Sequence, residues 1–191
     1  MWPVIVSADD INGDFLNDLD GEIEVHKLWK CDHPAIGSLP GEYHTPDGLK
    51  RFLDELAPIA EKLAAEGMDF SYHNHNHELM RYGEKTWLAM LYEQSNPRYL
   101  KAEIDTYWIQ VAGPDPSEIV ALMGARSPLL HIKDGPANRQ EPMMPIGSGV
   151  LDWPAILQAG ADHTEWLIVE LDRCGTDMPT AVKASYDYLV S

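Results

Sequence analysis

The chain has 191 residues, of which 45% are hydrophobic and 24% charged, as in an ordinary globular protein with a sizeable core. Its 31 acidic residues outnumber its 14 Lys and Arg residues, and the formal net charge of −17 argues against nucleic acid and anionic membranes as partners. No run approaches the roughly 18 apolar residues of a transmembrane helix. The first residues, MWPVIVSADD, lack the basic segment of a signal peptide, and Cys31 and Cys174 form no CxxC pair, so we expect a cytoplasmic location.

Short apolar strands alternate with helical patterns along the chain, and no linker interrupts them, so we expect one domain over residues 1–191. Such alternation predicts a parallel sheet with helices outside it. In chain order we predict a strand over 3–11, a helix over 14–30, a strand over 33–40, a helix over 45–67, a strand over 69–75, a helix over 84–95, a strand over 99–108, a helix over 115–125, a strand over 128–135, a helix over 152–160, a strand over 165–172 and a helix over 178–190.

The clearest helix is the one over residues 45–67. Thr45 can cap its start, Pro46 suits its first turn and Gly67 can end it. Its apolar residues recur at helical spacing and form one stripe. Pro58 lies inside the pattern, so we expect a kink or an interruption there.

Residues that can bind a metal gather at the C-terminal ends of the predicted strands, the end that forms the active face of a parallel α/β barrel. They are His73, His75, Asp105, His131 and Glu170. Strand alternation predicts a second residue on the same face two positions later. The resulting pairs are His73 with His75, Asp105 with Tyr107, His131 with Lys133, and Glu170 with Asp172.

Two carboxylates and two imidazoles at one point suit Mn²⁺, Zn²⁺, Co²⁺ or Fe²⁺, whereas Mg²⁺ or Ca²⁺ prefers oxygen ligands alone. The simpler interpretation of the segment HNHNH is a polar strand end with solvated histidines. Asp105 could merely cap the next segment, and Asp134 could cap a turn instead of contacting a substrate. We interpret His26, His33, His44 and His163 as surface residues.

The segments YHNHNHEL, EIDTYW, PLLHIKDG, PIGSGVLDWPAIL and WLIVELD together resemble the xylose isomerase-like TIM-barrel superfamily. The nearest resemblance is to its sugar phosphate isomerase/epimerase branch, which includes inosose dehydratases. The resemblance implies one divalent metal held by His73, Asp105, His131 and Glu170. Many relatives have glutamate at the position of His73, which leaves open whether His73 or His75 is the ligand and whether Glu78 is a base.

A complete barrel of this kind has about 250 residues and eight strands. In motif order the first two βα units are missing, so we expect an α/β TIM-type barrel of about six parallel strands. Its open strand edges should favour pairing with another copy, most simply as a dimer.

The resemblance implies a metal-dependent isomerase or epimerase that acts on a small sugar or polyol, free or phosphorylated, through an enediolate. Mn²⁺ is the first choice of metal, with Zn²⁺, Co²⁺, Fe²⁺ or Mg²⁺ as alternatives. Glu170 would be ligand and candidate base, His75 or Glu78 its partner on the opposite face of the substrate, and Lys133 would orient oxygen atoms. The alternatives are an inosose-type dehydratase, a non-catalytic sugar-binding remnant, and a DNA endonuclease of the same fold, against which the charge argues.

Overall fold

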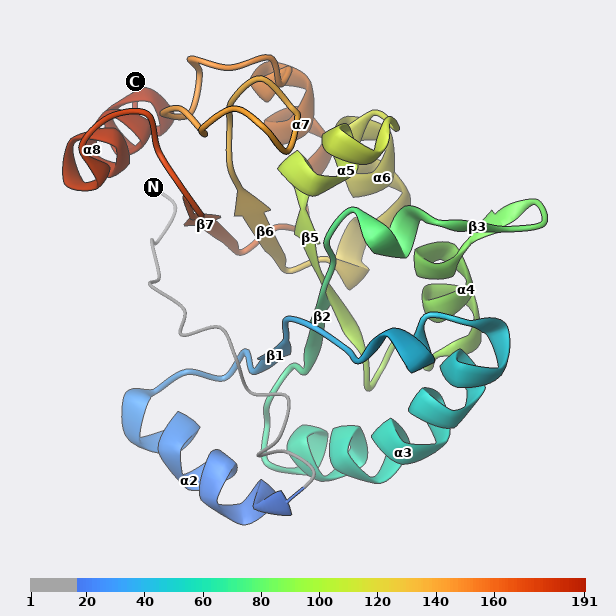
Figure 1. Ribbon diagram of the computed structural model, residues 1–191. Coiled ribbons are helices and arrows are strands. Elements are labelled where there is room, and N and C mark those ends of the chain that lie inside the picture. The colour runs from blue at the N-terminus through green and yellow to red at the C-terminus, as the bar shows by residue number, and fades with distance from the viewer. Residues whose placement is uncertain (1–16) are drawn as a thin grey trace. The chain divides into compact units, whose positions relative to one another are not determined.

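The computed structural model describes residues 17–191, which fall into two compact units, residues 17–102 and residues 103–191 (Figure 1). The strand predicted over 3–11 lies outside the described residues. The single domain over residues 1–191 stays a prediction. None of the described helices is long and apolar enough to cross a membrane.

The first unit contains a pair of short parallel strands, β1 (Ala35–Ile36) and β2 (Ser71–His73), with Ala35 opposite Ser71. A small antiparallel hairpin, β3 and β4, follows β2. The remaining elements of this unit are α2 (Leu19–Trp29), η1 (Gly41–Tyr43), α3 (Pro46–Ala65), η2 (His77–Leu79), β3 (Arg81–Tyr82), β4 (Lys85–Thr86) and α4 (Trp87–Gln94).

Helix α3 begins where the sequence predicts, because the Thr45 side chain accepts a hydrogen bond of 3.0 Å from the backbone N–H of Gly48. Its apolar stripe is buried, with Leu49 and Leu63 fully enclosed. The predicted interruption at Pro58 is wrong, since the helix runs unbroken from Pro46 to Ala65. Pro58 lies on the exposed face, where water can satisfy the carbonyl that the proline leaves without its helical partner.

The second unit is built on parallel strands β5 (Lys101–Asp105), whose last three residues belong to it, β6 (Leu129–Ile132) and β7 (Trp166–Val169). Asp105 lies opposite His131, and His131 lies opposite Ile168. Helix α6 packs against α5 and α7, and α8 packs against β7 (Figure 1). The other elements of this unit are α5 (Thr106–Ala112), α6 (Pro116–Met123), η3 (Gly124–Arg126), α7 (Trp153–Gly160) and α8 (Met178–Leu189).

The strand predicted over 99–108 is too long. It ends at Asp105, because the Asp105 side chain accepts a hydrogen bond of 2.9 Å from the backbone N–H of Trp108 and so starts α5. The prediction that Tyr107 shares a strand face with Asp105 is therefore wrong. Strand β2 likewise ends at His73, so His75 is not placed by strand alternation.

Buried Asp134 organises the long loop between β6 and α7. Its carboxylate accepts hydrogen bonds from the backbone N–H groups of Gly135, Gly147 and Gly149 at 2.8, 2.9 and 3.0 Å, and from Trp153 Nε1 at 2.8 Å. At Gly149 a Cβ atom would approach the Asp134 carboxylate to 2.0 Å, so a glycine is required there. Two roles were considered for Asp134, capping a turn or contacting a substrate. These hydrogen bonds give it the first, structural role.

We predict that Asp134→Asn lowers the free energy of unfolding by about 2–4 kcal/mol, because the new amide group must face buried N–H donors. Urea unfolding followed by tryptophan fluorescence measures the change. Asp162→Asn, at an exposed position in the same unit, is the matched control and should change little. Equal stability of the two variants would contradict the assigned role of Asp134.

Candidate metal centre

Three of the four predicted ligands converge at the C-terminal ends of the strands of the second unit. Asp105 ends β5, His131 lies in β6 and Glu170 directly follows β7. Ligand atoms of these three side chains lie within 4.8 Å of one another. Asp105 and His131 are fully buried, and the Glu170 side chain is 31% exposed. Parallel strands bring their ends to one edge, and this explains why residues so distant in sequence meet.

The His131 ring is held between two carboxylates. Its Nδ1 lies 3.0 Å from Glu170 Oε2, and its Nε2 lies 2.9 Å from Glu103 Oε1. Burial alone would lower the pKa of His131, but Glu103, Glu170 and Asp105 outweigh it and raise the pKa to about 10. Sequence reasoning missed Glu103, although an acid two residues before Asp105 in an apolar strand was the available signal.

Lys133 places a buried ammonium among three carboxylates. Its Nζ lies 3.1 Å from Asp105 Oδ2, 2.5 Å from Glu170 Oε2 and 3.3 Å from Asp172 Oδ1. Burial favours the neutral amine, but these carboxylates prevail and raise the pKa of Lys133. The predicted pairing of His131 with Lys133 and of Glu170 with Asp172 is thus seen in the cluster, although Lys133 and Asp172 lie just beyond their strands.

The pKa values of Glu170 and Asp172 are shifted in opposite directions. Burial would raise the pKa of Glu170, but His131 and Lys133 hold it well below the usual range. The pKa of Asp172 is raised, chiefly by burial and then by the charge of Glu170, against the attraction of Lys133. Glu170 is therefore ionised at neutral pH.

The cluster has the donor set and the charge that a divalent cation requires. Carboxylate oxygens from Asp105 and Glu170 and an imidazole nitrogen from His131 suit Mn²⁺, Fe²⁺, Co²⁺ or Zn²⁺. Four carboxylates, including Glu103 and Asp172, face one ammonium and one imidazole, so negative charge is in excess. A dication would offset most of that excess.

A pocket of about 240 Å³ opens beside this cluster in the second unit. Asp172, which contacts Lys133, lines the pocket together with Tyr107 and Trp108 from α5. The loop after β6 supplies a further wall that includes Arg139, whose backbone carbonyl accepts a hydrogen bond from Arg173. Trp108 thus forms part of the wall of this pocket.

The histidine-rich segment belongs to the first unit. His73 ends β2 and is 2% exposed, and its ring lies 4.9 Å from that of His75. Glu78 is fully buried and accepts hydrogen bonds from the His75 backbone N–H at 2.9 Å and from the Tyr72 hydroxyl at 2.8 Å. His73 as fourth ligand, with His75 as the alternative, stays a prediction.

The surface interpretation is wrong for three of the four histidines, since the His33 side chain is only 8% exposed. His26 is 4% exposed and His44 is 7% exposed. The His44 ring packs edge-on against Trp87 at 5.1 Å and against His77 at 4.5 Å. His163 is exposed, as predicted.

The model of the xylose isomerase-like TIM barrel family matches residues 4–191. The chain belongs to this family. The predicted family and the α/β class of the fold are thereby confirmed. A search of curated proteins found no match.

Solved structures of the same fold resemble the chain at low sequence identity. A sugar phosphate isomerase/epimerase from Parabacteroides distasonis ATCC 8503 has a TM-score of 0.78 and 23% identity, over 97% of this chain and 68% of that one. The probable 3-DHS dehydratase AsbF from Bacillus anthracis has a TM-score of 0.72 and 16% identity, over 99% and 74%. A D-allulose 3-epimerase from Methylomonas sp. has a TM-score of 0.71 and 17% identity, over 96% and 71%.

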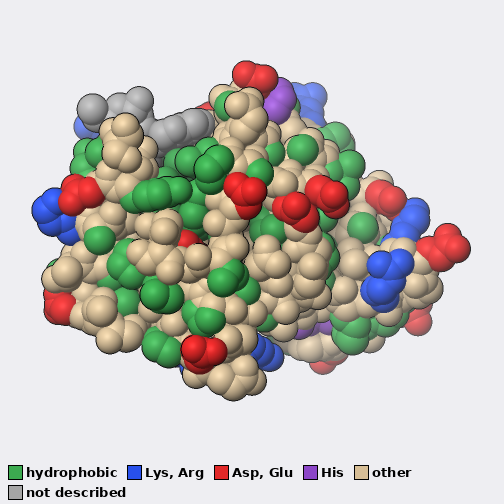
Figure 2. All heavy atoms as spheres, turned by 90° about the horizontal axis from the view of Figure 1, so that it is seen from above, with side chains coloured by type: hydrophobic (Ala, Val, Ile, Leu, Met, Phe, Trp, Pro, Cys, Tyr) green, Lys and Arg blue, Asp and Glu red, His purple; other side chains and the backbone are tan. Residues whose placement is uncertain are grey.

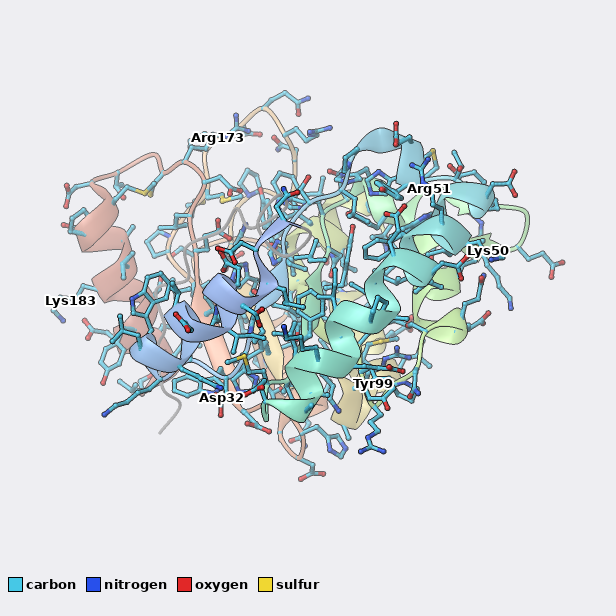
Figure 3. The ribbon with its side chains drawn as sticks, turned by 90° about the horizontal axis from the view of Figure 1, so that it is seen from below. Asp32, Lys50, Arg51, Tyr99, Arg173 and Lys183 are labelled. Carbon is cyan, nitrogen blue, oxygen red and sulfur yellow. The ribbon has the colours of Figure 1, made fainter. Side chains whose placement is uncertain are left out.

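We predict that Lys133→Met lowers the free energy of unfolding of the metal-free protein by about 3–5 kcal/mol, because it leaves buried carboxylates without their ammonium. Chemical denaturation at neutral pH measures the loss. Lys183→Met is the matched control, because Lys183 is exposed on α8, points into solvent (Figure 3) and pairs with the exposed Asp187. A loss no larger than that of the control would contradict the role of Lys133.

Proposed function

We propose that this protein is a metal-dependent isomerase or epimerase of a small sugar, free or phosphorylated. The observation that carries the proposal is the convergence of Asp105, His131 and Glu170 around the buried ammonium of Lys133, beside a small pocket. The family fold supports it, because TIM barrels carry their active sites at this end of the strands. The similar structures are two epimerases or isomerases and a probable dehydratase, which fit this class of chemistry.

Asp105, His131 and Glu170 would hold the metal, with His73 or His75 as the fourth ligand. Mn²⁺ is the first choice, and Zn²⁺, Co²⁺, Fe²⁺ or Mg²⁺ are alternatives. When bound, the metal supplies Lewis acidity at the oxygen atoms of the substrate. Glu103 lies behind His131 and would fix the orientation of its ring, as second carboxylates commonly do for metal-bound histidines.

The protein's own groups would move the proton. The ionised Glu170 carboxylate would remove hydrogen from the carbon next to the substrate carbonyl, which gives an enediolate. The Lys133 ammonium would stabilise the negative charge that develops on oxygen. His75 or Glu78 would return a proton from the opposite face.

A dehydratase is the second candidate, because the same proton abstraction leads to loss of water when a hydroxyl lies β to the carbonyl. Analysis of the product distinguishes the two reactions. A sugar-binding remnant without activity is the third alternative, and it predicts binding without exchange of substrate hydrogen.

Surface charge supports a small-molecule substrate over a nucleic acid. On the face that Figure 2 shows, acidic side chains are spread between apolar and uncharged groups, and basic ones lie toward its margins. The formal charge of −17 agrees with this distribution. Assembly as a dimer and a cytoplasmic location stay predictions, and light scattering at micromolar concentration tests the first.

We predict that the Mn²⁺-loaded protein exchanges hydrogen next to the carbonyl of a keto-sugar or inosose with solvent deuterium, without a nicotinamide cofactor. Mass spectrometry of the recovered ketone measures the exchange. Glu170→Gln should slow it by about 10²–10⁴-fold, whereas Glu118→Gln, at an exposed position, should not. Turnover that requires NAD(H), or a panel of ketones without any exchange, would contradict the proposal.

A further inference from the structure

A second group of metal-ligating side chains lies within the first unit. His44, His77 and Glu78 each offer a ligand atom, and these atoms lie within 4.8 Å of one another. Glu78 Oε1 lies 3.0 Å from His77 Nε2 and 3.7 Å from His44 Nε2. No step of the proposed reaction uses His44 or His77.

The His44 ring carries a buried polar atom that needs a partner. His44 is 7% exposed, and its Nε2 has no partner within hydrogen-bonding distance among residues 17–191. The 3.7 Å from this atom to Glu78 Oε1 exceeds the roughly 3.2 Å limit of an N–H···O hydrogen bond. The ring is fixed in place, because it packs against Trp87 and the His44 carbonyl accepts a hydrogen bond from the Tyr82 hydroxyl. A buried imidazole nitrogen held at this distance from a carboxylate oxygen suits two ligands of one cation.

The spacing of these atoms suits zinc. Bonds of about 2.0–2.2 Å in a tetrahedron separate ligand atoms by about 3.3–3.6 Å, and the distances of 3.0 and 3.7 Å to Glu78 Oε1 lie just below and just above that range. Two histidines and a glutamate form a known type of zinc ligand set that leaves a fourth position for water. The His77 side chain is 44% exposed, so the ion could enter from solvent.

Groups around Glu78 hold it in the required position. The His75 backbone N–H donates to Oε2, and the Tyr72 hydroxyl donates to Oε1. Such outer hydrogen bonds commonly orient carboxylate ligands. Tyr72 is itself fully buried in β2, so the carboxylate is anchored to the sheet.

We propose that His44, His77 and Glu78 bind a Zn²⁺ ion separate from the metal of the proposed reaction. The ion joins the turn before α3, which carries His44, to η2, which carries His77 and Glu78. It thereby stabilises the segment that also contains His73 and His75. With Glu78 engaged as a ligand, His75 is the remaining candidate for the second proton-transfer group.

The difference in bound zinc between variants and wild type tests this proposal. Zinc bound at the centre that contains Asp105 is common to all of these proteins and does not affect the difference. Metal-free wild type, His77→Gln and His163→Gln are dialysed against micromolar Zn²⁺ and analysed for bound metal. His163 is an exposed histidine of the second unit and supplies the matched control. We expect His77→Gln to bind one equivalent less than His163→Gln and than wild type.

A second variant and a second measurement guard against a folding defect. His44→Gln should lose the same equivalent, and circular dichroism establishes that both variants are folded. Zinc should also raise the melting temperature of His163→Gln more than that of His77→Gln. Equal zinc content in His163→Gln and in either folded variant would overturn the proposal.

Discussion

The buried ammonium of Lys133 is the charge on which the strand-end cluster depends. Asp105 and Glu170 are brought together by parallel strands, and Asp172 follows them, so three carboxylates, of which Asp105 is fully buried, surround one ammonium. Without a compensating cation their mutual repulsion would oppose the pairing of β5, β6 and β7. Lys133 therefore allows the chain to fold with a strongly acidic site already assembled.

Two acids, Asp105 and Asp134, connect the site to the elements around it. Asp105 uses Oδ1 to start α5 and Oδ2 to contact Lys133, so the helix that carries Tyr107 and Trp108 is fixed by a residue of the cluster. Asp134 lies one residue after Lys133 and holds the loop whose residues form another wall of the pocket. The backbone around the site and the geometry of the site therefore depend on the same short segments of the chain. A substitution of Asp105 or of Asp134 should disturb the backbone and the site together.

Sequence patterns predict the parts of this structure that follow from periodicity and local capping. The start of α3 at Thr45, the helices over 84–95 and 152–160 and the strand-end placement of Asp105, His131 and Glu170 are of this kind. The early end of β5 was not predicted, because Tyr107 and Trp108 favour strands and only the Asp105 cap decides for a helix.

Contacts between distant segments account for most of what the sequence did not predict. Glu103 is recognisable as part of the site only once His131 is known to lie beside it. His44 is an unremarkable loop histidine in the sequence, and its burial depends on Trp87 more than forty residues later. Helix α3 continues unbroken through Pro58 because Pro58 lies on its solvent-exposed face. The apolar stripe of the helix indicates that face only indirectly.

The central claim is that Asp105, His131 and Glu170 form a divalent metal centre. The most direct measurement is the Mn²⁺ content of wild type, Asp105→Ala and the exposed control Asp162→Ala. Each protein is freed of metal and titrated with Mn²⁺, and electron paramagnetic resonance measures the bound ion. We expect one tightly bound Mn²⁺ in wild type and in the control and its loss in Asp105→Ala. Full Mn²⁺ stoichiometry in folded Asp105→Ala would contradict the account.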